Sequence, residues 1–200
     1  MGSSDEFIKR LRDADDIALR ITRYEFRKAM GIYYIYWSTI TITFSILYFL
    51  AQEFPLIINQ GVANVIAIVI VILYVILSYF ILGGRFSRVR VRYSRARALI
   101  MYIVFSVLIA LIIYLELTPR YAGYTIMAAL LYALLIVVMT INGFVKVGVK
   151  PRYYDYAAMG SFIVCFTLGL GYMYYSMLYV LSLIWIYAGI RSLLEVIEGE

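Results

Sequence analysis

Long apolar runs alternate with short polar segments along most of the chain. A helix needs about 20 apolar residues to cross the hydrocarbon core of a bilayer, and five runs reach or approach this length. The last run, Tyr156–Ile190, is too long for one helix. Gly169 and Gly171 lie near its middle, and glycine weakens a helix and permits a turn. The pattern therefore predicts six spans, Gly31–Ala51, Leu56–Leu82, Ala98–Leu115, Ala122–Val145, Tyr153–Gly169 and Tyr172–Leu194.

Basic residues follow an alternating pattern between these spans. All but one of the 18 Lys and Arg residues lie before the first span, between the second and third, between the fourth and fifth, or after the core of the sixth. The exception is Arg120. Because cytoplasmic segments of membrane proteins carry the excess of Lys and Arg, we expect a multi-pass protein of the plasma membrane with both termini in the cytoplasm. Five or seven spans would break the alternation.

Residues 1–29 lack a long apolar run and carry charges of both signs. Opposite charges four residues apart, such as Asp16 and Arg20, stabilise a helix. A modest apolar stripe shares one helical face, and it consists of Phe7, Leu11, Ala14, Ala18 and Ile21. We expect an amphipathic helix that lies on the bilayer surface, or packs under the bundle, before the chain turns into the first span. Docking of a soluble partner is the alternative.

These patterns predict an all-α integral membrane fold. It is a six-helix transmembrane bundle of three helical hairpins, preceded by an N-terminal cytoplasmic amphipathic helix. The predicted units are the N-terminal helix 1–29, the six-span domain 30–195 and a C-terminal tail 196–200. Arg-Tyr pairs precede all three odd-numbered spans, at 23–24, 92–93 and 152–153. This indicates either a repeated hairpin or the usual placement of basic and aromatic residues at helix ends.

The composition supports lipid as the solvent of the apolar runs. Hydrophobic residues make up 64% of the chain and charged residues 15%, whereas soluble domains have roughly half and a quarter. The formal net charge of +6 would suggest a nucleic-acid partner in a soluble protein. Here the basic residues lie between apolar runs, so we expect contacts with anionic lipid headgroups and no nucleic acid.

Few residues of the chain are suited to catalysis or metal binding. Histidine is absent and Cys165 is the only cysteine, which excludes an intrachain disulfide and the usual His/Cys metal sites. Ionisable residues inside spans are usually functional, but we find none in the cores of the six runs. We therefore expect no catalytic residues, no metal and no cofactor.

Three groups of residues remain as candidates for function. The basic segment between the second and third spans is suited to lipid headgroups, and it contains Arg85, Arg88, Arg90, Arg92, Arg95 and Arg97. Polar side chains within spans serve either as interhelical hydrogen bonds or as a polar path, with Ser38, Thr41, Asn64 and Asn142 as its candidates. Small residues at four-residue spacing predict a helix-packing face, made of Ala157, Ser161, Cys165 and Gly169.

Three functions fit these features. The leading hypothesis is a non-enzymatic, permease-like or scaffold subunit of a membrane complex, because the spans have packing faces and no ionisable core. Its partners would be other membrane or cytoplasmic subunits or a second copy of the chain. The alternatives are a stand-alone facilitator of a small neutral or lipidic solute, and a lipid-modifying enzyme at the cytoplasmic interface. The scarcity of Asn and Gln indicates a thermophilic source.

Overall fold

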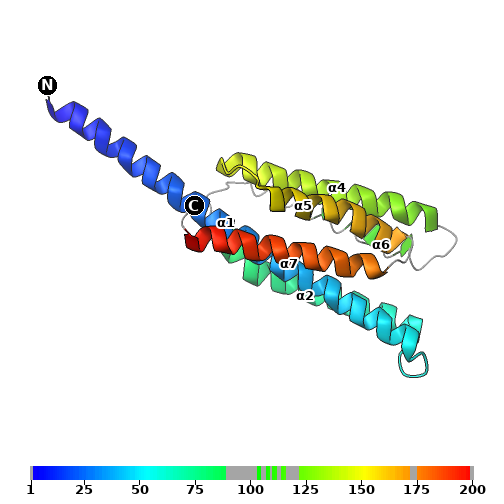
Figure 1. The fold of residues 1–200 in the computed structure, drawn as a ribbon. Coiled ribbons are helices and arrows are strands. Elements are labelled where there is room, and N and C mark those ends of the chain that lie inside the picture. The colour runs from blue at the N-terminus through cyan, green and yellow to red at the C-terminus, as the bar shows by residue number, and fades with distance from the viewer. Residues whose placement is uncertain are drawn as a thin grey trace.

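Helices form all of the regular secondary structure in the part of the chain that the structure describes. This computed structural model describes residues 2–88, short pieces between 103 and 115, 122–171 and 175–198. The elements are shown in Figure 1; in chain order they are α1 Gly2–Glu53, α2 Gln60–Arg88, α4 Ala122–Val147, α5 Tyr153–Ser161, the π-helix η2 Phe162–Phe166, α6 Thr167–Gly171 and α7 Tyr175–Glu198.

Four of the described helices are long and apolar enough to cross a membrane. They contain the segments Asp13–Glu53, Gly61–Phe86, Tyr124–Val147 and Ser176–Glu198. These segments overlap the first, second, fourth and sixth predicted spans, whereas the fifth predicted span, Tyr153–Gly169, is not among them. The third predicted span, Ala98–Leu115, lies for the most part outside the described residues.

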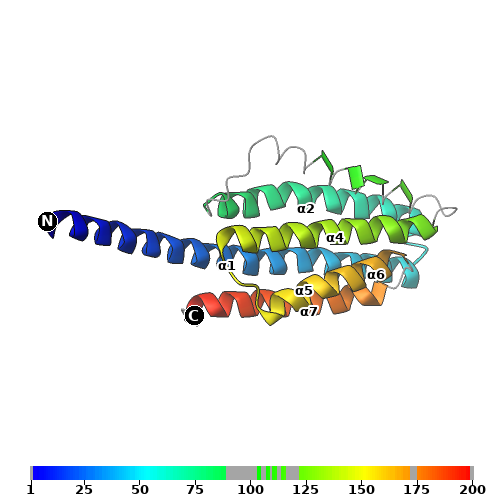
Figure 2. The ribbon, with the colours of Figure 1, turned by 90° about the horizontal axis from the view of Figure 1, so that it is seen from above.

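Helix α1 runs without a break through 52 residues, about 78 Å at 1.5 Å per residue. The turn that we expected between residue 29 and the first span does not form, so that prediction is wrong. Ala29 and Met30 are helical and buried. The first proline of the chain, Pro55, follows the helix end at Glu53, and proline disfavours helix at the residue before it. The N-terminal part of α1 therefore projects from the bundle (Figure 1 and Figure 2).

The long apolar run near the C-terminus forms two separate helical stretches, as its glycines predict. The first ends at Gly171 and α7 begins at Tyr175. They are antiparallel neighbours, since Tyr154 contacts Glu195 while Ala158, further along α5, accepts a hydrogen bond at 2.9 Å from the indole N–H of Trp185, which is earlier in α7.

The first stretch contains a π turn, Phe162–Phe166, which the sequence did not predict. A π turn holds more residues than an α turn and rotates the side chains that follow it. The predicted row of small residues therefore does not keep to one face. Ala157 is exposed and Ser161 half-buried, whereas Cys165 and Gly169 are buried.

Helix α1 packs against α2 and α7. Asn59 begins α2 by accepting a hydrogen bond from the backbone N–H of Val62 at 2.9 Å, as a helix-capping asparagine does. On the other side, Gly31 of α1 and Gly189 of α7 meet at a close crossing. A Cβ atom added to Gly189 would lie 2.9 Å from the Gly31 carbonyl oxygen. Small residues let two helix backbones approach in this way.

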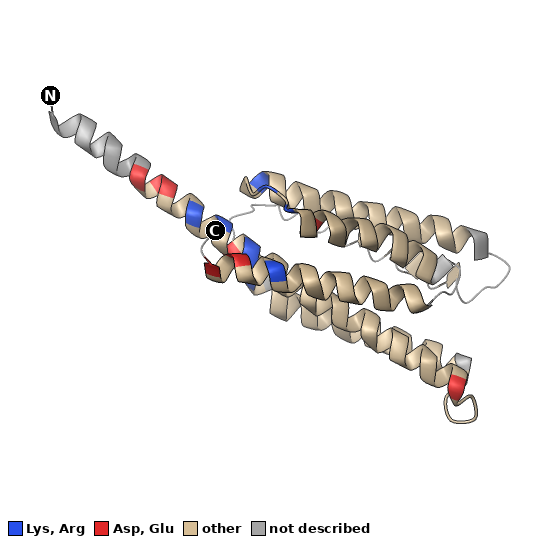
Figure 3. Ribbon diagram, in the orientation of Figure 1, with Lys and Arg blue, Asp and Glu red and all other residues tan. Residues whose placement is uncertain are grey.

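Charged and apolar side chains occupy different parts of the bundle. The described Lys and Arg residues gather near the end where α1 leaves the bundle (Figure 3), whereas Glu53 is the last residue of α1, at the opposite end of that helix. Between these ends the outward faces of α2 and α4 carry exposed aliphatic residues, including Val65, Ile72, Leu131 and Val138. An exposed apolar surface of this extent is typical of contact with lipid.

Candidate functional site

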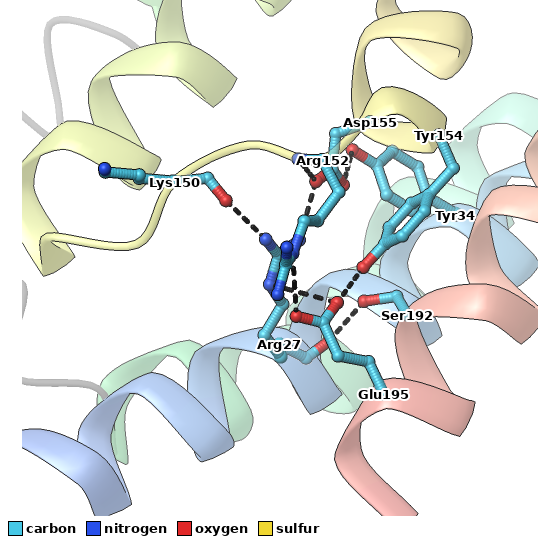
Figure 4. Close-up of polar contacts among 8 residues, drawn as sticks. All are labelled: Arg27, Tyr34, Lys150, Arg152, Tyr154, Asp155, Ser192 and Glu195. Carbon is cyan, nitrogen blue, oxygen red and sulfur yellow. Dashed lines mark hydrogen bonds and ion pairs between the residues drawn. The ribbon is translucent and has the colours of Figure 1, made fainter. Parts of the chain in front are cut away.

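A cluster of polar side chains lies where α1, the link between α4 and α5, α5 and α7 meet, at the basic end of the bundle (Figure 4). We call it the Arg27 cluster; its members are Arg27, Tyr34, Lys150, Arg152, Tyr154, Asp155, Ser192 and Glu195. Arg27 is 6% exposed and Asp155 is fully buried. Burying ions is costly unless they are paired and hydrogen-bonded, so the pairing of these groups decides what the cluster can do.

The guanidinium of Arg27 is engaged on every side. Nη1 donates to Asp155 Oδ2 at 2.6 Å, Nη2 donates to the Lys150 carbonyl oxygen at 2.5 Å, and Nε lies 3.7 Å from Glu195 Oε2. The rings of Phe144 and Tyr154 flank its central carbon, with centroids at 5.3 and 5.7 Å. Arginine suits such a site because its planar fork matches a carboxylate and its flat faces stack on rings.

Asp155 owes its position to the start of α5. Arg152 is the N-cap of that helix, and its backbone N–H donates to Asp155 Oδ2 at 2.8 Å. An acidic residue at this position satisfies a free N–H group and interacts favourably with the helix dipole. The other oxygen, Oδ1, accepts from the Tyr34 hydroxyl at 3.1 Å. Both carboxylate oxygens therefore have partners.

The link between α4 and α5 brings the Lys150 carbonyl to Arg27. Helix α4 ends at Val147, and the next residue, Gly148, has a φ of 68°, which lies in the left-handed region. The N–H of Gly148 donates to the Val145 carbonyl oxygen, and that of Val149 donates to the Phe144 carbonyl oxygen. This is the glycine-terminated helix end known as the Schellman motif. Val149 and Phe144 both pack in the central hydrophobic core, and this packing fixes the position of the link between α4 and α5.

Glu195 joins α7 to the same cluster. Its carboxylate accepts from the Tyr154 hydroxyl and from Arg152 Nε, the latter at 3.2 Å. Ser192, one turn earlier, donates to the Arg27 carbonyl oxygen at 2.9 Å. The positive charges of Arg27 and Arg152 are thus balanced by the carboxylates of Asp155 and Glu195. The contacts of the cluster connect α1, α5 and α7.

A pocket opens beside the cluster, between α5 and α7. We call it the α5–α7 pocket; its volume is about 210 Å³ and it is lined by Arg152, Tyr153, Tyr154, Arg191, Glu195 and Glu198. A second, apolar cavity of about 10 Å³ lies deeper, next to Tyr33, Tyr34 and Trp185. The second has room for about one water molecule, whereas the first has room for a small polar group.

The arrangement is suited to holding helices together. Among the described residues there is no group of three His, Cys, Asp or Glu side chains that could hold a metal ion. Asp155 is fully occupied by its partners, and a general base needs free access to a proton. The chemistry available to the Arg27 cluster is therefore ion pairing and hydrogen bonding between segments far apart in the sequence.

The sequence analysis missed this cluster. We found no ionisable residue in the cores of the six runs and did not single out Asp155, which is the third residue of the predicted span Tyr153–Gly169 and is fully buried. The sequence signal that could have revealed the role of Asp155 is a local one. Asp155 follows Arg152 by three residues, the spacing of a capping box, and it is the only Asp after Asp16.

The predicted site residues are dispersed. Arg85 donates to the Ile81 carbonyl oxygen of its own helix at 3.1 Å, and Arg88 is the last residue of α2. Four other predicted headgroup contacts lie outside the described residues, namely Arg90, Arg92, Arg95 and Arg97.

The predicted polar path is not assembled in one place. Ser38 is buried and donates to the Ile35 carbonyl oxygen, and Thr41 is hydrogen-bonded to Ser182 across the α1–α7 interface. Asn64 accepts from Tyr48 at 3.5 Å between α1 and α2, whereas Asn142 is exposed on α4. Ser38 and Thr41 therefore lie at one interface, and the two asparagines lie elsewhere.

Comparison with protein-family models, with curated proteins and with solved structures finds no match to this chain. A functional interpretation therefore depends on the geometry of the described residues.

Proposed function

We propose that this chain is a non-enzymatic scaffold subunit of a membrane complex, located in the plasma membrane with both termini in the cytoplasm. The observation that carries the proposal is the continuity of α1 from the bundle into a projecting helix, fixed where it leaves the bundle by the Arg27 cluster. Such a helix has a defined direction relative to the membrane, which is what a scaffold requires.

The six-span topology has support from the described helix ends. The end of α2, the end of α4, the start of α5 and the end of α7 all lie near Arg27 or its neighbour Phe26. Phe26 contacts the rings of Phe86 and Phe144. Both α2 and α4 therefore run toward the same end of the bundle, which favours a further span between them. The basic residues at this end favour its placement in the cytoplasm.

The projecting part of α1, residues 13–25, supports a role in docking; we call it the α1 arm. Ile17, Ile21 and Tyr24 are spaced four and three residues apart, so they share one face, and each is close to half exposed or more. Charged residues occupy much of the remaining surface of the arm. An apolar stripe on a helix outside the bundle favours contact with another protein surface.

The two alternative functions have less support. A facilitator needs polar groups around a shared path, and Asn64 and Asn142 lie apart from Ser38 and Thr41. A lipid-modifying enzyme at residues 85–97 depends mostly on residues outside the described ranges. The scaffold proposal depends on contacts of described residues alone.

Purification from the native membrane in a mild detergent tests the proposal. We expect the 23.1 kDa chain to elute with at least one further polypeptide at a fixed stoichiometry, measured by light scattering and mass spectrometry. Ile21→Ser on the apolar stripe should release that polypeptide. Leu19→Ser, also exposed on the arm but on the opposite face, is the matched control and should retain it. A wild-type chain that elutes as a lone monomer would contradict the proposal.

A further inference from the structure

We propose that the α5–α7 pocket binds the zwitterionic headgroup of a phospholipid, a phosphate followed by a primary ammonium, as in phosphatidylethanolamine. The inference goes beyond the scaffold proposal and requires only that the bundle spans a bilayer. It begins from the charges that line the pocket. Arg152 and Glu195 are occupied with each other, with Arg152 Nε 3.2 Å from Glu195 Oε1. Arg191 and Glu198 also line it, and within the described ranges neither is in an ion pair.

The order of these two charges along α7 matches the order of charges in the headgroup. Arg191 and Glu198 are seven residues apart, two helical turns or about 10 Å along the axis. They lie on the same face of α7. Arg191 is nearer the apolar part of the helix, and Glu198 is its last residue. In a phosphatidylethanolamine molecule the phosphate is next to the acyl chains and the ammonium is outermost. A lipid lying along α7 would therefore place phosphate at Arg191 and ammonium at Glu198.

The surroundings of Arg191 suit a phosphate at the edge of the membrane. The Arg191 guanidinium is hydrogen-bonded to the Tyr153 hydroxyl, and its remaining N–H groups can donate to phosphate oxygens. The Tyr153 and Tyr187 hydroxyls are 2.8 Å apart, and both rings are about half exposed. Amphipathic rings of this kind are favoured at headgroup depth, where their hydroxyl groups supply further hydrogen bonds.

The face of α7 that continues away from the pocket suits an acyl chain. Val180 and Leu183 are both exposed in the N-terminal half of α7, away from the pocket. A free phosphoethanolamine would use the polar contacts but would gain nothing from this apolar surface. The geometry therefore favours a membrane lipid over a soluble solute of the same chemistry.

The acidic residues of the pocket distinguish between lipids. Glu198, which lines the pocket without an ion-pair partner among the described residues, disfavours a headgroup that carries only negative charge, as in phosphatidylglycerol. A choline headgroup has a positive charge but no N–H group to donate to Glu198. We therefore expect a preference for ethanolamine over choline and glycerol headgroups.

Native mass spectrometry of the delipidated full chain, with the three lipids added at equal concentration and with identical acyl chains, tests this inference. Phosphatidylethanolamine should bind about tenfold more tightly than phosphatidylglycerol, the ratio expected for one charge-assisted hydrogen bond. Arg191→Gln should weaken binding of both lipids. Glu198→Gln should abolish the preference and leave phosphatidylglycerol binding intact. Arg20→Gln and Glu53→Gln make the same charge changes at exposed positions outside the pocket and should leave the preference unchanged.

Three results would overturn the inference. The first is equal binding of the ethanolamine and glycerol lipids by the wild-type chain, and the second is a preference that survives Glu198→Gln. The third is competition by soluble glycerophosphoethanolamine at concentrations as low as those of the lipid. Retention of each variant in the membrane after carbonate washing is measured in parallel. Loss of the wild-type chain in that wash would refute membrane insertion, whereas an inserted chain without a lipid preference would refute only the headgroup site.

Discussion

Arg27 and Asp155 lie 128 positions apart in the sequence and form a buried ion pair, with 2.6 Å between Nη1 and Oδ2. Their side chains are 7% and 0% exposed, so neither charge has water to replace a lost partner. A buried pair is not a large source of net stability, because its desolvation cost is comparable to its attraction. The pair instead penalises every packing arrangement in which one of the two charges is buried without its partner. The pair therefore specifies how α1 and α5 meet.

Removing one member of this pair should destabilise the bundle strongly. We expect Asp155→Asn to lower the free energy of unfolding by about 3–5 kcal/mol, because it leaves the Arg27 charge buried without its main counterion. Thermal unfolding in detergent, followed by near-UV circular dichroism, measures the change. Arg152→Gln is the control: its side chain is 54% exposed, and loss of such an ion pair costs less than about 1 kcal/mol. Equal effects of the two variants would contradict the role assigned to burial.

Replacing both members together should be tolerated better than replacing one. In Arg27→Met/Asp155→Leu neither member of the pair is left buried without the other, and Glu195 keeps Arg152 as its partner. Apolar replacements of buried ion pairs are often neutral or stabilising. We expect the double variant to melt above Asp155→Asn. Loss of membrane-inserted protein in the double variant alone would show that the pair is needed for insertion and not only for packing.

The amino-acid composition of the apolar runs was enough to predict spans, but the sequence did not predict the contacts between the helices. Four spans coincide with long apolar helices because the length of an apolar run decides whether it crosses a bilayer. The division near Gly169 was also predicted, because glycine acts locally. The Arg27–Asp155 pair was missed because its two halves meet only after α1 and α5 pack together. At the sequence level each of them is merely a charge near the end of an apolar run.

Two other features had signals that were not used. The continuity of α1 follows from the absence of proline before Pro55, since nothing in residues 2–53 forces the helix to end. Gly31 and Gly189 are small residues that let helices approach closely, but the sequence analysis did not single them out. That they meet at one crossing depends on the relative rotation of α1 and α7, which no local pattern encodes.

The crossing of α1 and α7 predicts a difference between two glycine-to-alanine substitutions. In Gly189→Ala the new Cβ would lie 2.5 Å from Ile35 Cγ1 and 2.9 Å from the Gly31 carbonyl oxygen. Because one of these atoms belongs to the backbone, the helices must separate. We expect a loss of roughly 1–3 kcal/mol, as in other overpacked interiors. Gly160→Ala meets nothing within 4 Å and should be neutral or slightly stabilising because alanine favours helix. A lower melting temperature for Gly160→Ala than for Gly189→Ala would be inconsistent with the crossing.

The end of α4 gives a fourth prediction about stability. Gly148 has a φ of 68°, a left-handed conformation that costs an L side chain roughly 1–2 kcal/mol. We expect Gly148→Ala to destabilise the protein by about that amount and Gly148→Asn by less, because asparagine tolerates this conformation. Melting temperatures of the two variants in the same detergent provide the comparison. Space around the position is not limiting, since the nearest atom to an added Cβ is 3.9 Å away.

The proposed topology predicts which positions of the chain face the cytoplasm. Cys165 is the only cysteine, so Cys165→Ala supplies a background into which single cysteines can be placed. Glu53 and Lys150 are both exposed and lie at opposite ends of the bundle, because α1 runs from Arg27, beside Lys150, to Glu53. In intact cells a membrane-impermeant maleimide should label Glu53→Cys. It should label Lys150→Cys only after the membrane is permeabilised. Labelling of Lys150→Cys in intact cells would place the Arg27 cluster outside the cell, against the preference of basic residues for the cytoplasmic side.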